Sequence, residues 1–150
     1  MDNNIGFIGL GNVGSKLAKN LLKDGFNLYV HDLNKYSSKE LIANGAIWSE
    51  SVSELILKTS IFITCLPSPL AVNEVMSNAI PFLTEKNLWI EMSTTDETEM
   101  KRLSKLCKKK GAKTLEAPIT GGQHRAESGN IAVLAAGNRE NFDRAFPILS

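Results

Sequence analysis

Apolar and polar positions along the chain follow two alternating patterns. Short, nearly continuous apolar runs are typical of strands buried on both faces of a parallel sheet, and they alternate with stretches whose apolar residues recur at helical spacing. Strands are predicted over residues 5–8, 28–31, 46–48, 61–66, 88–92, 113–117 and 131–136, with helical segments between them and a last helix after residue 138. This order predicts an α/β fold with a doubly wound, mostly parallel sheet and helices on both faces.

Several residue pairs indicate where helices begin and end. Asp96 and Glu99 have the spacing of a capping box at the start of one helix, and Ser51 and Glu54 have it at the start of another. A helical segment is expected from residue 70 to 76, continuing as helix or turn to residue 83. Pro147 is expected to interrupt or restart the last helix, because proline lacks the N–H that helix interiors need.

Three glycines follow the first predicted strand with the spacing G-x-G-x-x-G: Gly9, Gly11 and Gly14. Gly9 permits a sharp turn, Gly11 has no Cβ and lets a pyrophosphate approach the backbone, and Gly14 lets the next helix lie close to the strand. The free N–H groups of that helix would face the phosphates. Together with Asp32 at the end of the second strand, the pattern predicts a Rossmann-type dinucleotide site; the alternative is a plain βαβ unit with small residues for packing.

The residue at the end of the second strand also bears on the choice of cofactor. A carboxylate at Asp32 would accept hydrogen bonds from the ribose hydroxyls and repel a 2′-phosphate, and Leu33 rather than an arginine follows it. These residues favour NAD over NADP. Lys35 is a nearby cation, and it leaves NADP as the less favoured alternative.

Length, charge and cysteine content narrow the class of protein. The 150 residues fit one domain or part of a larger chain, and a net charge of +1 gives no reason to expect nucleic acid or a membrane as partner. Cys65 and Cys107 lack metal-ligand spacing and are interpreted as reduced thiols, so no metal site is expected. The first strand begins at Ile5, which leaves no room for a targeting peptide before it, and the expected location is cytoplasmic.

Four blocks in order carry a family resemblance: residues 6–14 (GFIGLGNVG), 65–68 (CLPS), 91–95 (EMSTT) and 116–129 (EAPITGG continuing to RAESG). They resemble the N-terminal half of the β-hydroxyacid dehydrogenases, the group of 3-hydroxyisobutyrate dehydrogenase and tartronate semialdehyde (glyoxylate) reductases. The resemblance implies that residues 1–150 form a Rossmann NAD-binding domain. It also implies that an all-helical domain and the family's catalytic lysine lie beyond Ser150. No catalytic residue is therefore expected in this chain, and the isolated piece should bind cofactor with little or no turnover.

The expected cofactor contacts combine the residue patterns with this resemblance: Gly9, Leu10, Gly11, Asn12, Val13, Gly14, Asp32, Leu66, Pro67, Val72 and Thr94. Leu66 and Pro67 follow a central strand, where open α/β sheets place their ligands. The hydroxyl of Thr94 suits the nicotinamide ribose or carboxamide, although Ser93 or Thr95 could serve as well, and helix capping is the alternative role. The resemblance implies that Thr120, Gly121 and Gly122 hold the substrate carboxylate.

The resemblance has departures, and other functions stay open. Glu116 and Thr120 stand where the family usually has aspartate and serine, which leaves the substrate undefined among small 3-hydroxy acids. His31 is interpreted as a wall residue, and His124 and Arg125 as loop surface. One alternative is an enzyme resembling 6-phosphogluconate dehydrogenase, and another is a non-catalytic Rossmann module that binds cofactor or a protein. The parent protein is expected to be a homo-oligomer.

Overall fold

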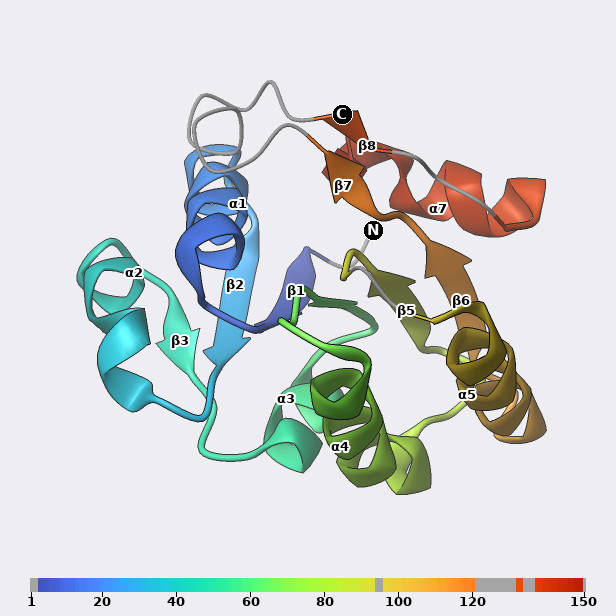
Figure 1. Cartoon of the computed structure of the whole chain (residues 1–150). Helices are drawn as coiled ribbons and strands as arrows, with labels where there is room; N and C mark the ends of the chain where they lie inside the picture. Colours follow the sequence, from blue (N-terminus) through green and yellow to red (C-terminus); the bar gives the residue numbers. More distant parts are fainter. Residues whose placement is uncertain (1–2, 94–95, 121–131, 134–136, 150) are drawn as a thin grey trace.

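The computed structural model describes residues 3–93, 96–120, 132–133 and 137–149. Its centre is a six-stranded sheet in which every neighbouring pair is parallel, in the order β3-β2-β1-β4-β5-β6 (Figure 1). The strands are β1 (Asn4–Ile8), β2 (Asn27–His31), β3 (Ile47–Trp48), β4 (Ile61–Thr64), β5 (Leu88–Glu91) and β6 (Lys113–Glu116). The chain order reverses between β1 and β4, as in a Rossmann fold, and the predicted fold class is confirmed.

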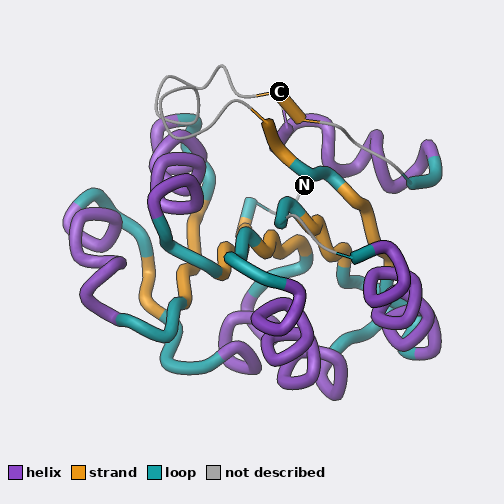
Figure 2. Tube along the Cα trace, viewed as in Figure 1, coloured by secondary structure: helices purple, strands orange, loops and turns teal. Residues whose placement is uncertain are grey.

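Helices cover both faces of the sheet. They are α1 (Asn12–Lys23), α2 (Lys39–Ala43), α3 (Val52–Lys58), α4 (Pro69–Ala79), α5 (Glu97–Lys109) and α7 (Arg139–Leu149), with short 3-10 helices η1 (Lys35–Ser38) and η2 (Ile80–Phe82). Figures 1 and 2 show α3, α4 and α5 on one side of the sheet and α1 and α7 on the other. None of the helices in the described part of the chain has the length and apolar character to cross a membrane.

Two hydrophobic cores, one on each face, account for the continuous apolar runs of the strands. Successive side chains of a strand point to opposite faces. Ile61 and Ile63 therefore join the core beneath α1 and α7, whereas Phe62 joins the core formed with α3, α4 and α5. Trp89 is wholly buried on that second side. A strand with both faces buried cannot alternate apolar and polar residues, which is why the sequence pattern identified β4 and β5.

The chain leaves the main sheet after β6. Pro118 follows β6, and the next strand, β7 (Ile119–Thr120), pairs antiparallel with β8 (Ala132–Val133) in a separate two-stranded sheet. Proline cannot donate to a strand ladder, so the break comes where the sequence predicts the strand to stop. The strand predicted over residues 131–136 exists at 132–133, and its other residues lie outside the described ones.

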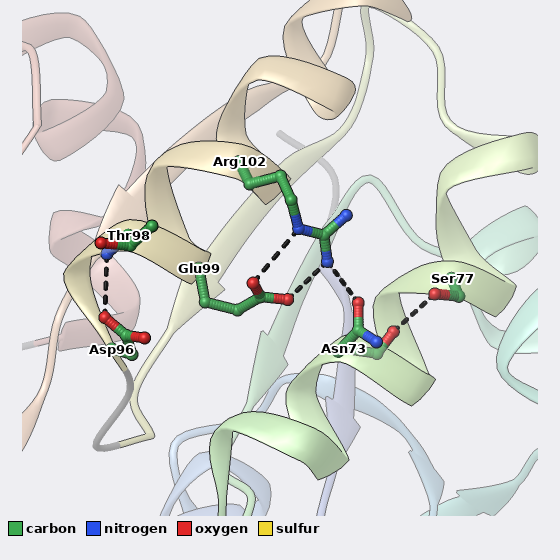
Figure 3. A network of polar contacts seen from close by, with 6 residues as sticks. All are labelled: Asn73, Ser77, Asp96, Thr98, Glu99 and Arg102. Atoms are coloured by element: carbon green, nitrogen blue, oxygen red, sulfur yellow. Dashed lines mark hydrogen bonds and ion pairs between the residues drawn. The ribbon is translucent and has the colours of Figure 1, made fainter.

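Two predictions about helix ends are wrong. α7 continues through Pro147 to Leu149, because the proline lies exposed in the last turn and removes only one helical hydrogen bond there. Asp96 caps α5 by accepting a bond from the Thr98 N–H at 3.0 Å, but Glu99 does not complete a capping box. Its carboxylate instead binds Arg102 one turn later (Figure 3).

The other predicted capping box is present in altered form. Ser51 Oγ accepts a hydrogen bond from the Glu54 N–H at 3.1 Å, as expected. The Glu54 carboxylate reaches back one residue further than a capping box requires, to the backbone N–H of Glu50 at 2.6 Å. This bond fixes the backbone between β3 and α3, and that segment forms part of the site described next.

Candidate functional site

A groove of about 1190 Å³ lies at the carboxyl ends of the parallel strands, where the chain order of the sheet reverses. Open α/β sheets bind ligands at this position, because loops from both halves of the sheet diverge there. Eight of the residues expected to contact a cofactor line it: Gly9, Gly11, Asn12, Val13, Gly14, Asp32, Leu66 and Pro67. The sequence thus identified one continuous surface made from the ends of three strands and the start of a helix.

The glycine turn at the start of α1 has the geometry that the spacing predicts. Gly9 has a φ of +103°, and a Cβ there would lie 2.2 Å from the carbonyl oxygen of Cys65. A Cβ on Gly14 would lie 2.1 Å from the carbonyl oxygen of Gly9, so the helix packs directly on the turn. A Cβ on Gly11, by contrast, would meet no protein atom within 4 Å. Gly9 and Gly14 allow the tight turn and the close packing of the helix on it, as predicted. The space beside Gly11 instead opens onto the groove.

The N-terminus of α1 offers backbone N–H groups to the same space. Its N-cap is Gly11, which provides no side-chain cap, and no acidic residue lies in the first turn. The first N–H groups of a helix have no partner inside it, and they carry the positive end of the helix dipole. The residues that line the groove here therefore fit an anion such as a pyrophosphate.

Asp32 is held rigidly at the end of β2. Its Oδ2 accepts a hydrogen bond from the Leu10 N–H at 2.7 Å, and its Oδ1 accepts one from the Asn34 N–H at 2.8 Å. Each carboxylate oxygen keeps further acceptor capacity for a ribose hydroxyl. Leu10, another expected cofactor contact, does not line the groove. Its side chain is buried in the core and its N–H binds Asp32, so it positions the carboxylate rather than lining the groove.

Beyond Asp32, the groove wall comes from the end of β3 and the segment after it, which the sequence did not mark as functional. Trp48 and Glu50 both line the groove. His31 Nδ1 lies 2.9 Å from the Ser49 carbonyl oxygen, and its ring lies 5.4 Å from the Trp48 ring. His31 is thus a wall residue, as predicted. The available signal for Trp48 and Glu50 was their position directly at the end of a predicted parallel strand.

The opposite end of the groove rests on a buried polar network between β4 and β5. The Leu66 N–H donates to Ser93 Oγ at 2.7 Å, and the Ser93 N–H donates to Glu91 Oε1 at 2.6 Å. The same Oε1 accepts from Thr64 Oγ1 at 3.0 Å, and Thr64 Oγ1 accepts from Trp89 Nε1 at 2.8 Å. Leu66 and Ser93 line the groove, so this network fixes its floor.

Glu91 is the unusual member of this network. It is 1% exposed, and its Oε2 has no hydrogen-bond partner among the described residues. Burial raises the pKa of the Glu91 carboxyl, against the opposing hydrogen bonds from Ser93 and Thr64. Burial also raises the pKa of the Cys65 thiol to about 11, with a further contribution from Glu91, so Cys65 is a neutral thiol on the groove wall.

Val72, an expected cofactor contact, does not line the groove. Its side chain is wholly buried in the core with Met76 and Ala79. The groove is lined instead by Ala71 and Val75, one position before and three after it. Helical spacing explains the difference: residues 72, 76 and 79 share the face of α4 that packs on the sheet, so a neighbouring face reaches the groove.

The remaining predicted site residues are only partly covered by the described structure. Thr94, Gly121 and Gly122 lie outside the described residues. Thr120 is the last residue of β7, next to Ile119, which lines the groove. In the described part of the chain, no group of His, Cys, Asp and Glu side chains is arranged to hold a metal ion.

Comparison with known proteins agrees with this geometry. A family model described as the NAD binding domain of 6-phosphogluconate dehydrogenase matches residues 4–150. Mouse mitochondrial 3-hydroxyisobutyrate dehydrogenase is 37% identical over 148 residues, which are 97% of this chain and 44% of that protein. Glyoxylate/succinic semialdehyde reductase 1 of Arabidopsis thaliana is 32% identical over 146 residues, 95% of this chain and 50% of that protein.

A solved structure is similar over the whole chain. The 3-hydroxyisobutyrate dehydrogenase of Mycobacterium tuberculosis, solved with L-serine, superposes with a TM-score of 0.94 at 27% identity, covering 99% of this chain and 51% of that one. The chain therefore spans about half the length of the relatives it matches. Its matched residues include the glycine turn, Asp32 and the strands that form the groove. The chain belongs to the family of the 6-phosphogluconate dehydrogenase NAD-binding domain, as the N-terminal NAD-binding domain of the β-hydroxyacid dehydrogenase group.

Proposed function

We propose that this chain is the cofactor half of an NAD-dependent dehydrogenase acting on a small 3-hydroxy acid of the 3-hydroxyisobutyrate, glyoxylate or tartronate semialdehyde type. The observation that carries the proposal is the combination, in one groove, of an uncapped helix N-terminus, an open space at Gly11 and a fixed carboxylate at Asp32. The names of the similar proteins support the substrate class.

The groove gives each part of the cofactor a matching surface. The pyrophosphate would lie against the backbone of residues 11–14, and the adenine ribose hydroxyls would donate to Asp32. The nicotinamide would lie toward Leu66, Pro67 and Ser93, on the floor that the buried network supports. When bound, the cofactor supplies the hydride exchanged with the substrate carbon, and this chain binds and orients it.

NAD rather than NADP is the proposed cofactor. The two backbone N–H bonds fix the Asp32 carboxylate at the end of β2, and there it would repel a 2′-phosphate bound to the same groove, because like charges at short range repel. Leu33 follows with 97% of its surface exposed and offers no charge to a phosphate. This preference also argues against an enzyme of the 6-phosphogluconate dehydrogenase type, which normally uses NADP.

The proposed substrate site lies beyond the nicotinamide end, at Thr120, Gly121 and Gly122. A hydroxyl and successive backbone N–H groups would suit a carboxylate there. We propose that a lysine beyond residue 150 moves the hydroxyl proton, within a homo-oligomeric, cytoplasmic parent protein. Residues 1–150 alone would then bind cofactor without appreciable turnover, because loss of a general acid–base costs about 10² to 10⁴-fold in rate.

Calorimetric titration of the purified chain with NADH tests the cofactor site. Gly11→Val should weaken binding at least about tenfold without unfolding the chain, since the added side chain meets no protein atom nearby and fills the phosphate space. Asp32→Asn should weaken it by roughly tenfold through loss of the charge that accepts the ribose hydroxyls. Asp24→Asn, at the exposed C-cap of α1, is the matched control and should bind like the wild type. Wild-type protein that releases no heat with NADH or NADPH would refute the proposed function.

A further inference from the structure

The adenosine end of the groove contains one lysine whose charge is already compensated. Among the described residues that line the groove, Lys35 is the only lysine or arginine. It begins η1, three positions after Asp32. A cation in this region is what a Rossmann site uses to accept the 2′-phosphate of NADP. An unpaired Lys35 would therefore weaken the preference for NAD over NADP that Asp32 creates.

Glu50 forms an ion pair with this lysine. Lys35 Nζ lies 3.3 Å from Glu50 Oε1 and 5.6 Å from the centroid of the Trp48 ring. The two charged side chains are 63% and 73% exposed, so the pair lies at the rim of the groove in contact with solvent. The Trp48 indole, whose N–H has no partner within hydrogen-bond distance among the described residues, and the Lys35 ammonium lower the pKa of Glu50 by their proximity, so its carboxylate is charged at neutral pH.

The pair comes from two segments that meet only in the fold. Lys35 follows β2, whereas Glu50 lies between β3 and α3. The backbone N–H of Glu50 donates to the Glu54 carboxylate at 2.6 Å, which fixes the position from which its side chain extends. Trp48, at the end of β3, contributes the aromatic face over which the lysine lies.

We propose that Glu50 is a specificity-determining residue, which by pairing with Lys35 keeps that lysine from binding a 2′-phosphate and so favours NAD over NADP. This inference rests on the proposed cofactor site and refines it. Asp32, Glu50 and Lys35 give the rim two negative charges and one positive charge, a net charge of −1. NAD has no charge at its 2′-hydroxyl, whereas a phosphate monoester carries about two negative charges at neutral pH.

The test measures the Kd of NADH and of NADPH for the full chain and for Glu50→Gln. Removing one charge at a solvated rim should lower the ratio Kd(NADPH)/Kd(NADH) by about three- to tenfold. The double variant Lys35→Met/Glu50→Gln should return the ratio to the wild-type value or above it, because the released cation is gone. Glu97→Gln is the matched control. It breaks another exposed ion pair, to Lys101 at 3.1 Å, on a helix that does not line the groove, and it should leave the ratio unchanged.

The outcomes separate this inference from the proposed function. A lower ratio in Glu50→Gln that the double variant reverses would support it. A ratio that does not move in Glu50→Gln, or that falls equally in the double variant, would overturn it while leaving the NAD site intact. Failure of the wild type to bind either nucleotide would instead refute the proposed function, and the inference with it.

Discussion

Two networks of hydrogen bonds join neighbouring elements of this fold. One is buried, and the other is exposed to solvent. One joins β4 to β5 beneath the groove through Thr64, Trp89, Glu91 and Ser93, which are all buried. The other joins α4 to α5 at the surface, where Arg102 binds both Glu99 and Asn73 (Figure 3). The first network lies where it can fix the shape of the groove floor, whereas the second lies where water can replace its contacts.

Burial explains why the two networks are expected to contribute differently to the free energy of unfolding. A buried polar group that loses its partner keeps the whole cost of its lost hydration, whereas an exposed group returns to water. The opposite effects on two glutamates illustrate this. Burial raises the pKa of Glu91, while the hydrogen bond from Arg102 lowers the pKa of Glu99. The buried network can therefore hold the groove floor, and the exposed one should contribute little to stability.

The largest effect is expected for Thr64→Val, a change of almost the same shape. The Trp89 indole N–H would lose its acceptor and Glu91 Oε1 would lose a donor, and both atoms belong to buried residues. We expect a loss of about 2 to 4 kcal/mol in the free energy of unfolding, measured by urea denaturation. Ser77→Ala is the matched control. It removes an exposed hydroxyl that donates to the Asn73 carbonyl oxygen at 2.7 Å, and its unfolding midpoint should stay near the wild type. Equal losses in the two variants would contradict the comparison.

The two networks also differ in how far the sequence predicts them. Glu99 and Arg102 are three positions apart on one helix, a spacing at which side chains meet. Thr64 and Glu91 are 27 positions apart and meet because β4 and β5 pair in a register that aligns them. No local pattern fixes that register, so the sequence did not predict that these two side chains would meet.

The same distinction applies to the candidate site. The glycine turn and Asp32 were predictable, because each depends on backbone geometry and on the end of one strand. The ion pair of Lys35 with Glu50 was not, because it depends on how β3 lies beside β2. The burial of Val72 was not predictable either, because a helix next to a groove turns one face to the sheet and another to the groove. Only the packed structure shows which residues lie on which face.

An intermediate effect, visible only as a dependence on pH, is expected for Glu91→Gln. The pKa of Glu91 in the folded chain is raised above the ordinary value of 4.5, so the native state holds this proton more tightly than the unfolded state. Its contribution to stability is complete below that value and is lost as pH rises through the folded pKa. The wild type should therefore lose up to about 1.4 kcal/mol per pH unit relative to Glu91→Gln in this window.

Urea unfolding of both proteins at a series of pH values between about 2 and 8 measures this slope. Glu99→Gln sharpens the comparison because its sign is opposite. The lowered pKa of Glu99 stabilises the fold above the unfolded value of 4.5, and this contribution is lost as pH falls through the folded pKa. The free energies of unfolding of the wild type and of Glu91→Gln could instead differ by the same amount at every pH. That result would show that Glu91 ionises in the fold as it does in water.

The smallest effect is expected for Arg102→Ala. Arg102 joins α4 to α5 through Asn73 and pairs with Glu99, and its side chain is 48% exposed. Water replaces such contacts readily and salt screens them, so the urea midpoint should move little in low salt and not measurably in about 1 M salt. The packing between α4 and α5 should persist, because Met76, Met100 and Leu103 remain buried in their shared core. A loss as large as that of Thr64→Val would mean that the surface network holds the two helices together, and burial would then no longer separate the two networks.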